Sequence, residues 1–172
     1  YHSIITAIAG GASRLNEIAT KTGLASSGCS AQIQSLITLG IIKKETPLTE
    51  GIKSRKTLYT LEDFMFLFWY RFVRPNLSGI MRGIGETIYE VSVKPQISHF
   101  MGYIFEEICK QYLYLPQIYM TLPFPTGEFG RWWGNNPKKK RQEEIDLMAE
   151  NGSEAIFGEC KWRNEPADVD IL

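Results

Sequence analysis

The stretch from residue 143 to residue 162 reads EEIDLMAENGSEAIFGECKW and predicts two strands joined by a turn at Asn151-Gly152. Apolar and acidic side chains alternate around Asp146 in the first run, and Glu159 and Lys161 stand two residues apart in the second. Because side chains two apart on a strand share a face, Glu159 and Lys161 project together. We expect Asp146 to meet them from the neighbouring strand, so that two carboxylates and an ammonium converge.

Such a cluster suits a hard divalent cation. Magnesium is bound through one or two carboxylates and keeps several waters and substrate phosphate oxygens around it. We therefore predict Mg²⁺ at Asp146 and Glu159, with Lys161 stabilising a developing negative charge or positioning a water. The alternative is that the acidic side chains of these alternating strands form an ordinary solvated sheet face.

The spacing resembles the PD-(D/E)xK nuclease superfamily, the restriction-endonuclease-like fold. There an acidic residue begins one strand and an acid-x-lysine step lies on the next, as Asp146 and Glu159-Cys160-Lys161 do here. The superfamily often adds a glutamate from the preceding helix. Residues 102–113 resemble that helix, with Glu106 as the better match and Glu107 as the alternative. The resemblance implies a catalytic set of Glu106, Asp146, Glu159 and Lys161, with Mg²⁺ held by Glu106, Asp146 and Glu159.

The first forty residues predict three short helices. Apolar residues at helical spacing mark the first, around Ile4 to Ile8. Ser13 is expected to cap the second helix, which ends near Gly23. Ser26 or Ser27 is expected to cap the third, which ends at Gly40. Three short helices with a tight turn predict a helix-turn-helix.

Two strand-like runs follow, at residues 41–45 and 57–61, joined by a loop with glycine and basic residues. This hairpin would be the wing of a winged helix, a module that binds DNA through its third helix and its basic loop. The DNA-contacting residues would be Ser26, Ser27, Ser30, Gln32, Gln34, Lys53, Arg55 and Lys56. The alternative is a winged helix that serves as a protein-protein module or a rigid spacer.

The composition changes after residue 61. Residues 61–73 predict an aromatic helix that is apolar nearly all round, which we expect to be buried and to end at Pro75. A second helical segment follows, with a boundary at Pro95. After this boundary we expect one helix and then strands, at residues 96–115, 117–122, 128–134, 143–149 and 155–162.

A second basic cluster precedes Asp146. Lys138, Lys139, Lys140 and Arg141 lie on the predicted hairpin and could reach DNA phosphates, which would make binding salt-dependent. The alternative is that this run of charge is only the solvated tip of a hairpin.

The order of these segments resembles the region that follows the ATPase core in archaeal-type AAA ATPases, which also occur in bacteria. The resemblance covers nearly the whole chain and rests on FWYRF at 68–72, GRWWG at 130–134, EID at 144–146 and ECKW at 159–162. It implies that a P-loop domain upstream binds ATP. This chain contains no Gly-x-x-x-x-Gly-Lys-Ser/Thr, so we expect no ATP site in it and expect it to be a fragment.

The composition limits the partners and the compartment. With 19 basic and 19 acidic residues, the chain is not a general nucleic-acid coat, although a local basic face is compatible with this balance. Three scattered cysteines without a CxxC motif predict free thiols, no zinc site and a reducing cytoplasm. No apolar run is long enough to cross a bilayer, so no membrane partner is expected.

Together these patterns predict an α+β chain with a winged helix at 1–61 and a helical connector at 62–95. A restriction-endonuclease-like α/β/α domain would occupy 96–172 and be incomplete at its C-terminus. The predicted function is metal-dependent phosphodiester cleavage of nucleic acid, chiefly DNA, in partnership with the parent chain's ATPase domain. The alternative is a non-catalytic regulatory or docking arm of that ATPase, with an inactive nuclease fold.

Overall fold

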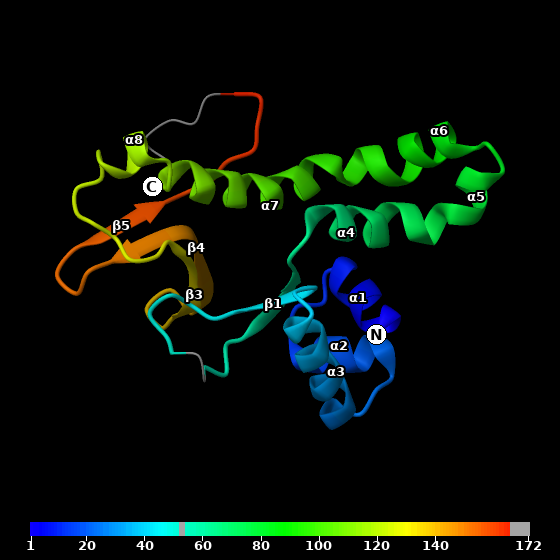
Figure 1. The fold of residues 1–172 in the computed structure, drawn as a ribbon, viewed down its shortest axis with the longest axis horizontal. Coiled ribbons are helices and arrows are strands. Elements are labelled where there is room, and N and C mark those ends of the chain that lie inside the picture. The colour runs from blue at the N-terminus through cyan, green and yellow to red at the C-terminus, as the bar shows by residue number, and fades with distance from the viewer. Residues whose placement is uncertain (52–53, 166–172) are drawn as a thin grey trace. The chain divides into compact units, whose positions relative to one another are not determined.

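The computed structural model describes residues 1–51 and 54–165 and divides the chain into two compact units (Figure 1). Unit 1 comprises Tyr1–Glu45 and Arg55–Pro95, and unit 2 comprises Thr46–Ser54 and Gln96–Leu172. The chain is mixed α+β, with helices and a hairpin in unit 1 and an antiparallel sheet in unit 2. None of the helices in the described ranges is both long enough and apolar enough to span a bilayer.

Unit 1 begins with the helices α1 (His2–Ala9), α2 (Leu15–Thr22) and α3 (Ser26–Thr38). Their apolar residues recur at helical spacing and face a common core, where Ile4 and Ile18 are fully buried. The predicted helices of the first forty residues are confirmed. Gly23 (φ 67°) and Gly40 (φ 70°) follow α2 and α3 in the left-handed region, as glycine does after a helix.

The predicted serine cap of α2 is wrong. The cap residue is Arg14, and Glu17 Oε2 accepts hydrogen bonds from the backbone N–H groups of Ser13 (3.0 Å) and Arg14 (3.1 Å). These bonds, that of Ser13 most strongly, hold the pKa of Glu17 below its ordinary value. A carboxylate in the first turn thus satisfies the free N–H groups that we expected a hydroxyl to satisfy.

The predicted serine cap of α3 is also wrong. Ala25 occupies the cap position without any side-chain hydrogen bond, and Ser26 and Ser27 lie inside the first turn. The hairpin predicted after these helices is confirmed. Its strands β1 (Ile42–Glu45) and β2 (Leu58–Leu61) pair antiparallel.

The aromatic segment is helical but is not buried all round. It forms α4 (Phe64–Phe68), a π-helix (Trp69–Val73) and a 3₁₀ turn (Arg74–Asn76). Met65 is 72% exposed and Trp69 is 44% exposed, so one face of the segment is open in the described chain. The expectation of complete burial is therefore wrong.

Pro75 does not end a helix, whereas the boundary predicted at Pro95 coincides with the end of unit 1. Pro75 lies at the start of its 3₁₀ turn, and α5 (Leu77–Met81) follows directly. Proline fits there because the first helical N–H groups have no intrahelical acceptor. After α6 (Gly85–Ile88) a π-helix (Tyr89–Val93) leads into α7 (Lys94–Leu113), which contains Pro95 in its first turn.

The sheet of unit 2 contains β3 (Gly130–Asn136), β4 (Arg141–Glu150) and β5 (Ala155–Gly158), paired antiparallel in that order. The strands expected at 128–134 and 143–149 are confirmed. The strand expected at 117–122 is wrong, because this region contains α8 (Pro116–Tyr119). A short apolar run fits a helix or a strand equally, and Pro116 at the first helical position favours the helix.

The last strand is shorter than expected. It ends at Gly158, so Glu159, Cys160 and Lys161 lie in the segment that follows β5 rather than on the strand. The shared strand face that the spacing predicted for Glu159 and Lys161 therefore does not exist. The two side chains are instead held together by their own ion pair.

Residues 46–51 and 54, in the segment between β1 and β2, belong to unit 2. The backbone N–H of Leu48 donates to the carbonyl oxygen of Arg131 (2.9 Å), and Trp132 Nε1 donates to Thr49 Oγ1 (3.1 Å). Trp133 is buried in the sheet core beside residues such as Phe129. One tryptophan of the 130–134 run is thus core, and its neighbour fixes this segment.

Candidate functional site

The acid-lysine step, Glu159-Cys160-Lys161, lies against Asp146 of β4. Asp146 Oδ2 accepts a hydrogen bond from the backbone N–H of Cys160 at 2.8 Å. Lys161 Nζ donates to Glu159 Oε1 and forms an ion pair with it. The structure therefore brings Asp146 to the acid-lysine step, as the sequence predicted, through a side chain to backbone contact.

The two ends of the acid-lysine step remain accessible. The side chain of Lys161 is 40% exposed and that of Glu159 is 29% exposed, so solvent and small ions can reach both. The hydrogen bond with Glu159 is the main cause that raises the pKa of Lys161, and the charges of Glu159 and Asp146 add to it. Lys161 therefore stays a cation near neutral pH, which suits charge stabilisation and not proton abstraction.

The fourth predicted catalytic residue is engaged elsewhere. Glu106 of α7 pairs with Arg131 of β3, with 3.5 Å between Glu106 Oε2 and Arg131 Nε. Arg131 also pairs with Glu144 of β4. Glu106 and Arg131 are each less than one quarter exposed. The sequence does not predict this ion-pair network, since only helix-on-sheet packing brings residues 106 and 131 together.

Aromatic packing holds the acid-lysine step near the helix that carries Glu106. The ring of Trp162 lies 5.5 Å from that of Phe105, and the Trp162 Cβ is 4.0 Å from where a side chain at Gly102 would begin. Burial raises the pKa of the Cys160 thiol, and the nearby Cys109, Asp146 and Glu106 reinforce the effect. The segment after β5 is thus fixed between β4 and α7.

The metal prediction can be compared with this arrangement. Within residues 1–51 and 54–165, no group of three or more His, Cys, Asp or Glu side chains is placed to hold a metal ion. Asp146 of β4 and Glu159 of the segment after β5 are two carboxylates on either side of the Cys160 contact, and a magnesium ion that keeps most of its water needs only one or two such donors. Glu106, paired with Arg131, is not part of that donor pair.

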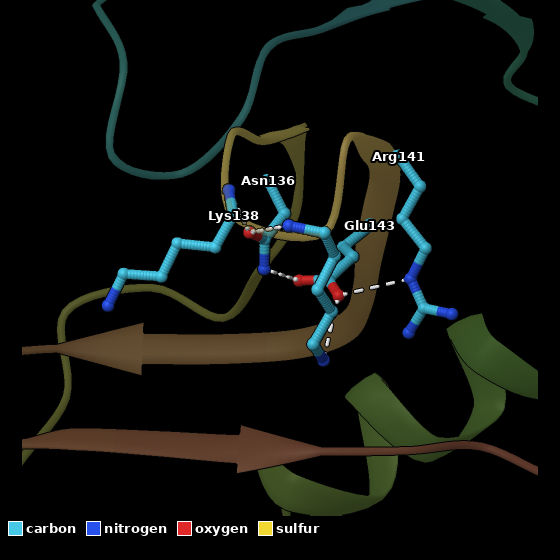
Figure 2. A network of polar contacts seen from close by, with 5 residues as sticks. Asn136, Lys138, Arg141 and Glu143 are labelled. Carbon is cyan, nitrogen blue, oxygen red and sulfur yellow. Dashed lines mark hydrogen bonds and ion pairs between the residues drawn. The ribbon is translucent and has the colours of Figure 1, made fainter.

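The basic hairpin, residues 138–141 between β3 and β4, is organised around one carboxylate (Figure 2). Glu143 accepts from Asn136 Nδ2 (2.8 Å) and pairs with Lys139 (3.1 Å) and Arg141 (3.3 Å). The pKa of Glu143 is lowered from 4.5 to about 2. The hydrogen bond from Asn136 is the largest cause, and the interactions with Lys139 and Arg141 add to it. Asn136 Oδ1 also accepts from the backbone N–H groups at positions 138 and 139.

This network divides the four cations of the basic hairpin. Lys139 and Arg141 are paired with Glu143, whereas Lys138 and Lys140 are exposed and have no carboxylate partner among the described residues. Lys140 adopts φ 50° at the tip. Lys138 and Lys140 are therefore the cations of this hairpin that can meet a phosphate without first breaking an ion pair.

The predicted DNA contacts of unit 1 lie on the surface of α3 and near β2. Ser26, Ser27, Ser30 and Gln34 are exposed, and Arg55 and Lys56 are exposed before β2. Gln32 differs, because its Oε1 accepts from the amino group of Tyr1 (3.1 Å). Lys53 lies outside the described residues. These positions are accessible to a ligand, and DNA binding by them remains a prediction.

Comparison with known proteins gives a family for most of this chain. Residues 69–171 match DUF234, described as archaeal and bacterial proteins of unknown function. An uncharacterized protein of Methanocaldococcus jannaschii is 35% identical over 166 residues, which cover 95% of this chain and 36% of the relative. The chain thus spans about a third of the length of the relative. No solved structure gives a significant match to the chain.

Proposed function

We propose that this chain, which belongs to the DUF234 family of archaeal and bacterial proteins, is the nucleic-acid-binding and nuclease-like arm of a longer P-loop ATPase. Unit 1 would be its winged helix, and unit 2 would be its PD-(D/E)xK-type domain. The chemistry would be metal-dependent cleavage of a phosphodiester, with DNA as the substrate class. The chain's share of its archaeal relative, 36% of the length, leaves room for such an ATPase domain.

One observation carries this proposal. The 2.8 Å hydrogen bond from the Cys160 N–H to Asp146 Oδ2 puts an acidic residue of one strand beside an acid-x-lysine step that follows the next. This is the juxtaposition that the PD-(D/E)xK resemblance requires. It arises between antiparallel neighbours, β4 and β5, and not from chance proximity of surface side chains.

Each residue of the site has a distinct task under this proposal. Asp146 and Glu159 would hold Mg²⁺, which supplies Lewis acidity and a more acidic bound water. The N–H of Cys160 orients the Asp146 carboxylate. Lys161 would stabilise the charge that develops on the phosphate oxygens. Glu106 acts indirectly, because its pair with Arg131 fixes α7 against β3.

A second function is favoured by a different observation. All the predicted catalytic side chains already have partners, since Lys161 pairs with Glu159 and Glu106 pairs with Arg131. Such internal pairing suits a non-catalytic arm whose nuclease-like fold docks nucleic acid or a partner chain for the ATPase. In that case the exposed Lys138 and Lys140 would bind phosphates while the acidic cluster only stabilises unit 2.

A cleavage assay separates the two functions. The full-length parent protein, with and without ATP, would be incubated with labelled single-stranded and duplex DNA in the presence of Mg²⁺ or Mn²⁺. If the site is catalytic, Asp146→Asn and Lys161→Ala each lower the cleavage rate by about a hundredfold or more. Glu150→Gln, at an exposed position on the same strand, is the matched control and should cut at the parental rate.

Binding measurements complete the comparison. Calorimetric titration of Mg²⁺ into the chain should show a site that Asp146→Asn removes and Glu150→Gln retains. Metal binding without cleavage of any substrate would favour the docking arm. If the protein neither binds metal nor cleaves DNA, but binds DNA in a way that Lys138→Ala and Lys140→Ala weaken, the phosphodiesterase function is ruled out.

A further inference from the structure

A second candidate site lies in unit 1, apart from every residue discussed so far for nucleic acid or metal. It is an open depression of about 530 Å³ where α1, α2 and the 3₁₀ turn at Arg74 come together. Its lining consists of Ser3, Thr6, Ala7, Gly10, Lys21 and Arg74. Ligand pockets in proteins have volumes of about 300–1,000 Å³, so the depression has room for a small ligand.

The charge of this depression is unbalanced. Two of its lining residues are cationic, Lys21 and Arg74, and none is acidic. Lys21 Nζ donates to the carbonyl oxygen of Gly10 (3.1 Å), and Arg74 Nη1 donates to Thr6 Oγ1 (3.2 Å). Both cations thus have neutral acceptors, and neither has a carboxylate ion-pair partner among the described residues.

The one carboxylate near Lys21 along α2 is turned away. Glu17 lies one turn earlier, and its Oε2 accepts from the backbone N–H groups of Ser13 and Arg14 (3.0 and 3.1 Å). The charge of Glu17 still interacts with that of Lys21, but Glu17 is not among the residues that line the depression. The two lining cations can therefore meet an anion from solvent.

The arginine is held in place before any ligand arrives. The Arg74 guanidinium lies over the ring of Tyr70, 5.4 Å from its centroid, and the Tyr70 hydroxyl contacts His2 Nδ1 (2.7 Å). Thr6 Oγ1 donates its proton to the carbonyl oxygen of His2 (2.8 Å). The lone pairs of Thr6 Oγ1 are thus free to accept from Arg74. A preorganised arginine loses less conformational entropy when it binds an oxyanion.

We propose that this depression binds the phosphate group of a phosphomonoester, with Arg74 and Lys21 as the charged ligands and the Ser3 hydroxyl as a neutral one. A phosphomonoester carries a charge between about −1.5 and −2 at neutral pH and offers three acceptor oxygens, which matches two cations with several donors. A phosphodiester carries one charge only and would leave one of the two cations uncompensated. The site therefore discriminates phosphate ends from the phosphate backbone.

Isotope-labelled protein titrated with inorganic phosphate at about pH 8, where the second ionisation near 6 is complete, tests the proposal by NMR. Saturable shifts of the amide signals of α1 and α2 are expected. Lys21→Gln and Arg74→Gln should each weaken binding by about tenfold or more, the usual worth of a charge-assisted hydrogen bond. Arg82→Gln, an exposed arginine of unit 1 outside the depression, should bind as the parent does.

One further variant and a second ligand keep the result decisive. Arg74→Lys retains the charge and should recover part of the affinity. If Arg74→Gln does not fold, its NMR spectrum will show this, and Lys21→Gln then provides the test. Dimethyl phosphate, a monoanionic diester, should bind more weakly than inorganic phosphate. Equal affinities for the two ligands, unchanged binding in Lys21→Gln, or no saturable shifts at millimolar phosphate would each overturn the proposal.

The source of the phosphomonoester is then read from two more probes. If adenosine monophosphate binds more tightly than inorganic phosphate, and Lys21→Gln weakens this binding, the ligand is a small phosphorylated molecule. If a 5′-phosphorylated oligonucleotide binds more tightly than its 5′-hydroxyl form, and Lys21→Gln weakens this binding, the ligand is the phosphorylated end of a nucleic acid. Failure of Asp146→Asn to affect either result distinguishes this site from the proposed phosphodiesterase site.

Discussion

Asp146 Oδ2 lies 2.8 Å from the backbone nitrogen of Cys160, so a strand carboxylate fixes the segment that carries Glu159 and Lys161. This contact has a structural and a functional side. It satisfies an N–H group immediately after β5 ends, and it orients one oxygen of the carboxylate while the other can face a ligand. Four predictions follow from this contact and its neighbours.

Removal of the Asp146 acceptor should destabilise unit 2. Asp146→Ala leaves the half-buried Cys160 N–H without its acceptor and should lower the free energy of unfolding by about 1–3 kcal/mol. Asp146→Asn keeps an amide oxygen in the same place and should lose less. Urea unfolding followed through amide NMR signals of unit 2 measures both. Equal losses in the two variants would show that the hydrogen bond contributes little.

The pair between Glu106 and Arg131 should show a measurable coupling. Both side chains are less than one quarter exposed, so the pair is only partly screened by water. Glu106→Gln and Arg131→Met should each destabilise unit 2, with a coupling energy of about 0.5–3 kcal/mol in a double-mutant cycle. A coupling near zero would assign Arg131 to Glu144 alone. The pair Lys94 and Glu90, exposed on both sides, is the control with weak coupling.

Glu143 should titrate far below other glutamates. Its folded pKa of about 2 lies below the ordinary value of 4.5 because Asn136, Lys139 and Arg141 favour the charged form. The stabilisation that it provides is therefore fully present above about pH 4.5 and is lost as the pH falls through about 2. Carboxyl NMR titration measures this pKa directly. Asn136→Ala should move it upward, since the Asn136 hydrogen bond is its largest cause.

The Cys160 thiol should react slowly with alkylating reagents near neutral pH. Burial and the neighbouring Cys109, Asp146 and Glu106 raise its pKa, so the thiolate is scarce. The folded protein would be alkylated with iodoacetamide and the modification followed by mass spectrometry. The reaction rate of Cys160 should lie below that of a small free thiol and rise steadily with pH. A rate at neutral pH that matches the free thiol would contradict the raised pKa. Denatured protein provides the control for intrinsic reactivity.

Much of the local structure was predictable from the sequence. The helices of the first forty residues, the hairpin of β1 and β2, and the strands β3 and β4 follow from residue spacing and turn residues, and the structure has them. The meeting of Asp146 with the acid-lysine step was also predictable, because an Asn-Gly turn makes the strands antiparallel neighbours. The end of β5 at Gly158 was not, since the alternation of side chains continues beyond it.

The errors share one origin. Ser13 was expected to cap α2, but its backbone N–H donates to Glu17, and Pro75 was expected to end a helix although it lies in the first turn of a 3₁₀ helix, where proline is tolerated. In each case two local solutions were compatible with the same residues. In the cap of α2 the selecting group, Glu17, lies within four residues of Ser13, so the local pattern contained both solutions without ranking them.

The sequence by itself determined most of the helices and strands, with α8 and the end of β5 as exceptions, and it identified the Asp146 and Glu159-Cys160-Lys161 pattern, because these properties depend on residues close together along the chain. Only the tertiary structure decided that Glu106 pairs with Arg131 and that residues 46–51 belong to unit 2. It alone brought Lys21 and Arg74 to one depression. These relationships join residues far apart in sequence, and the packing of helices on one another and on the sheet sets them, which no local periodicity encodes.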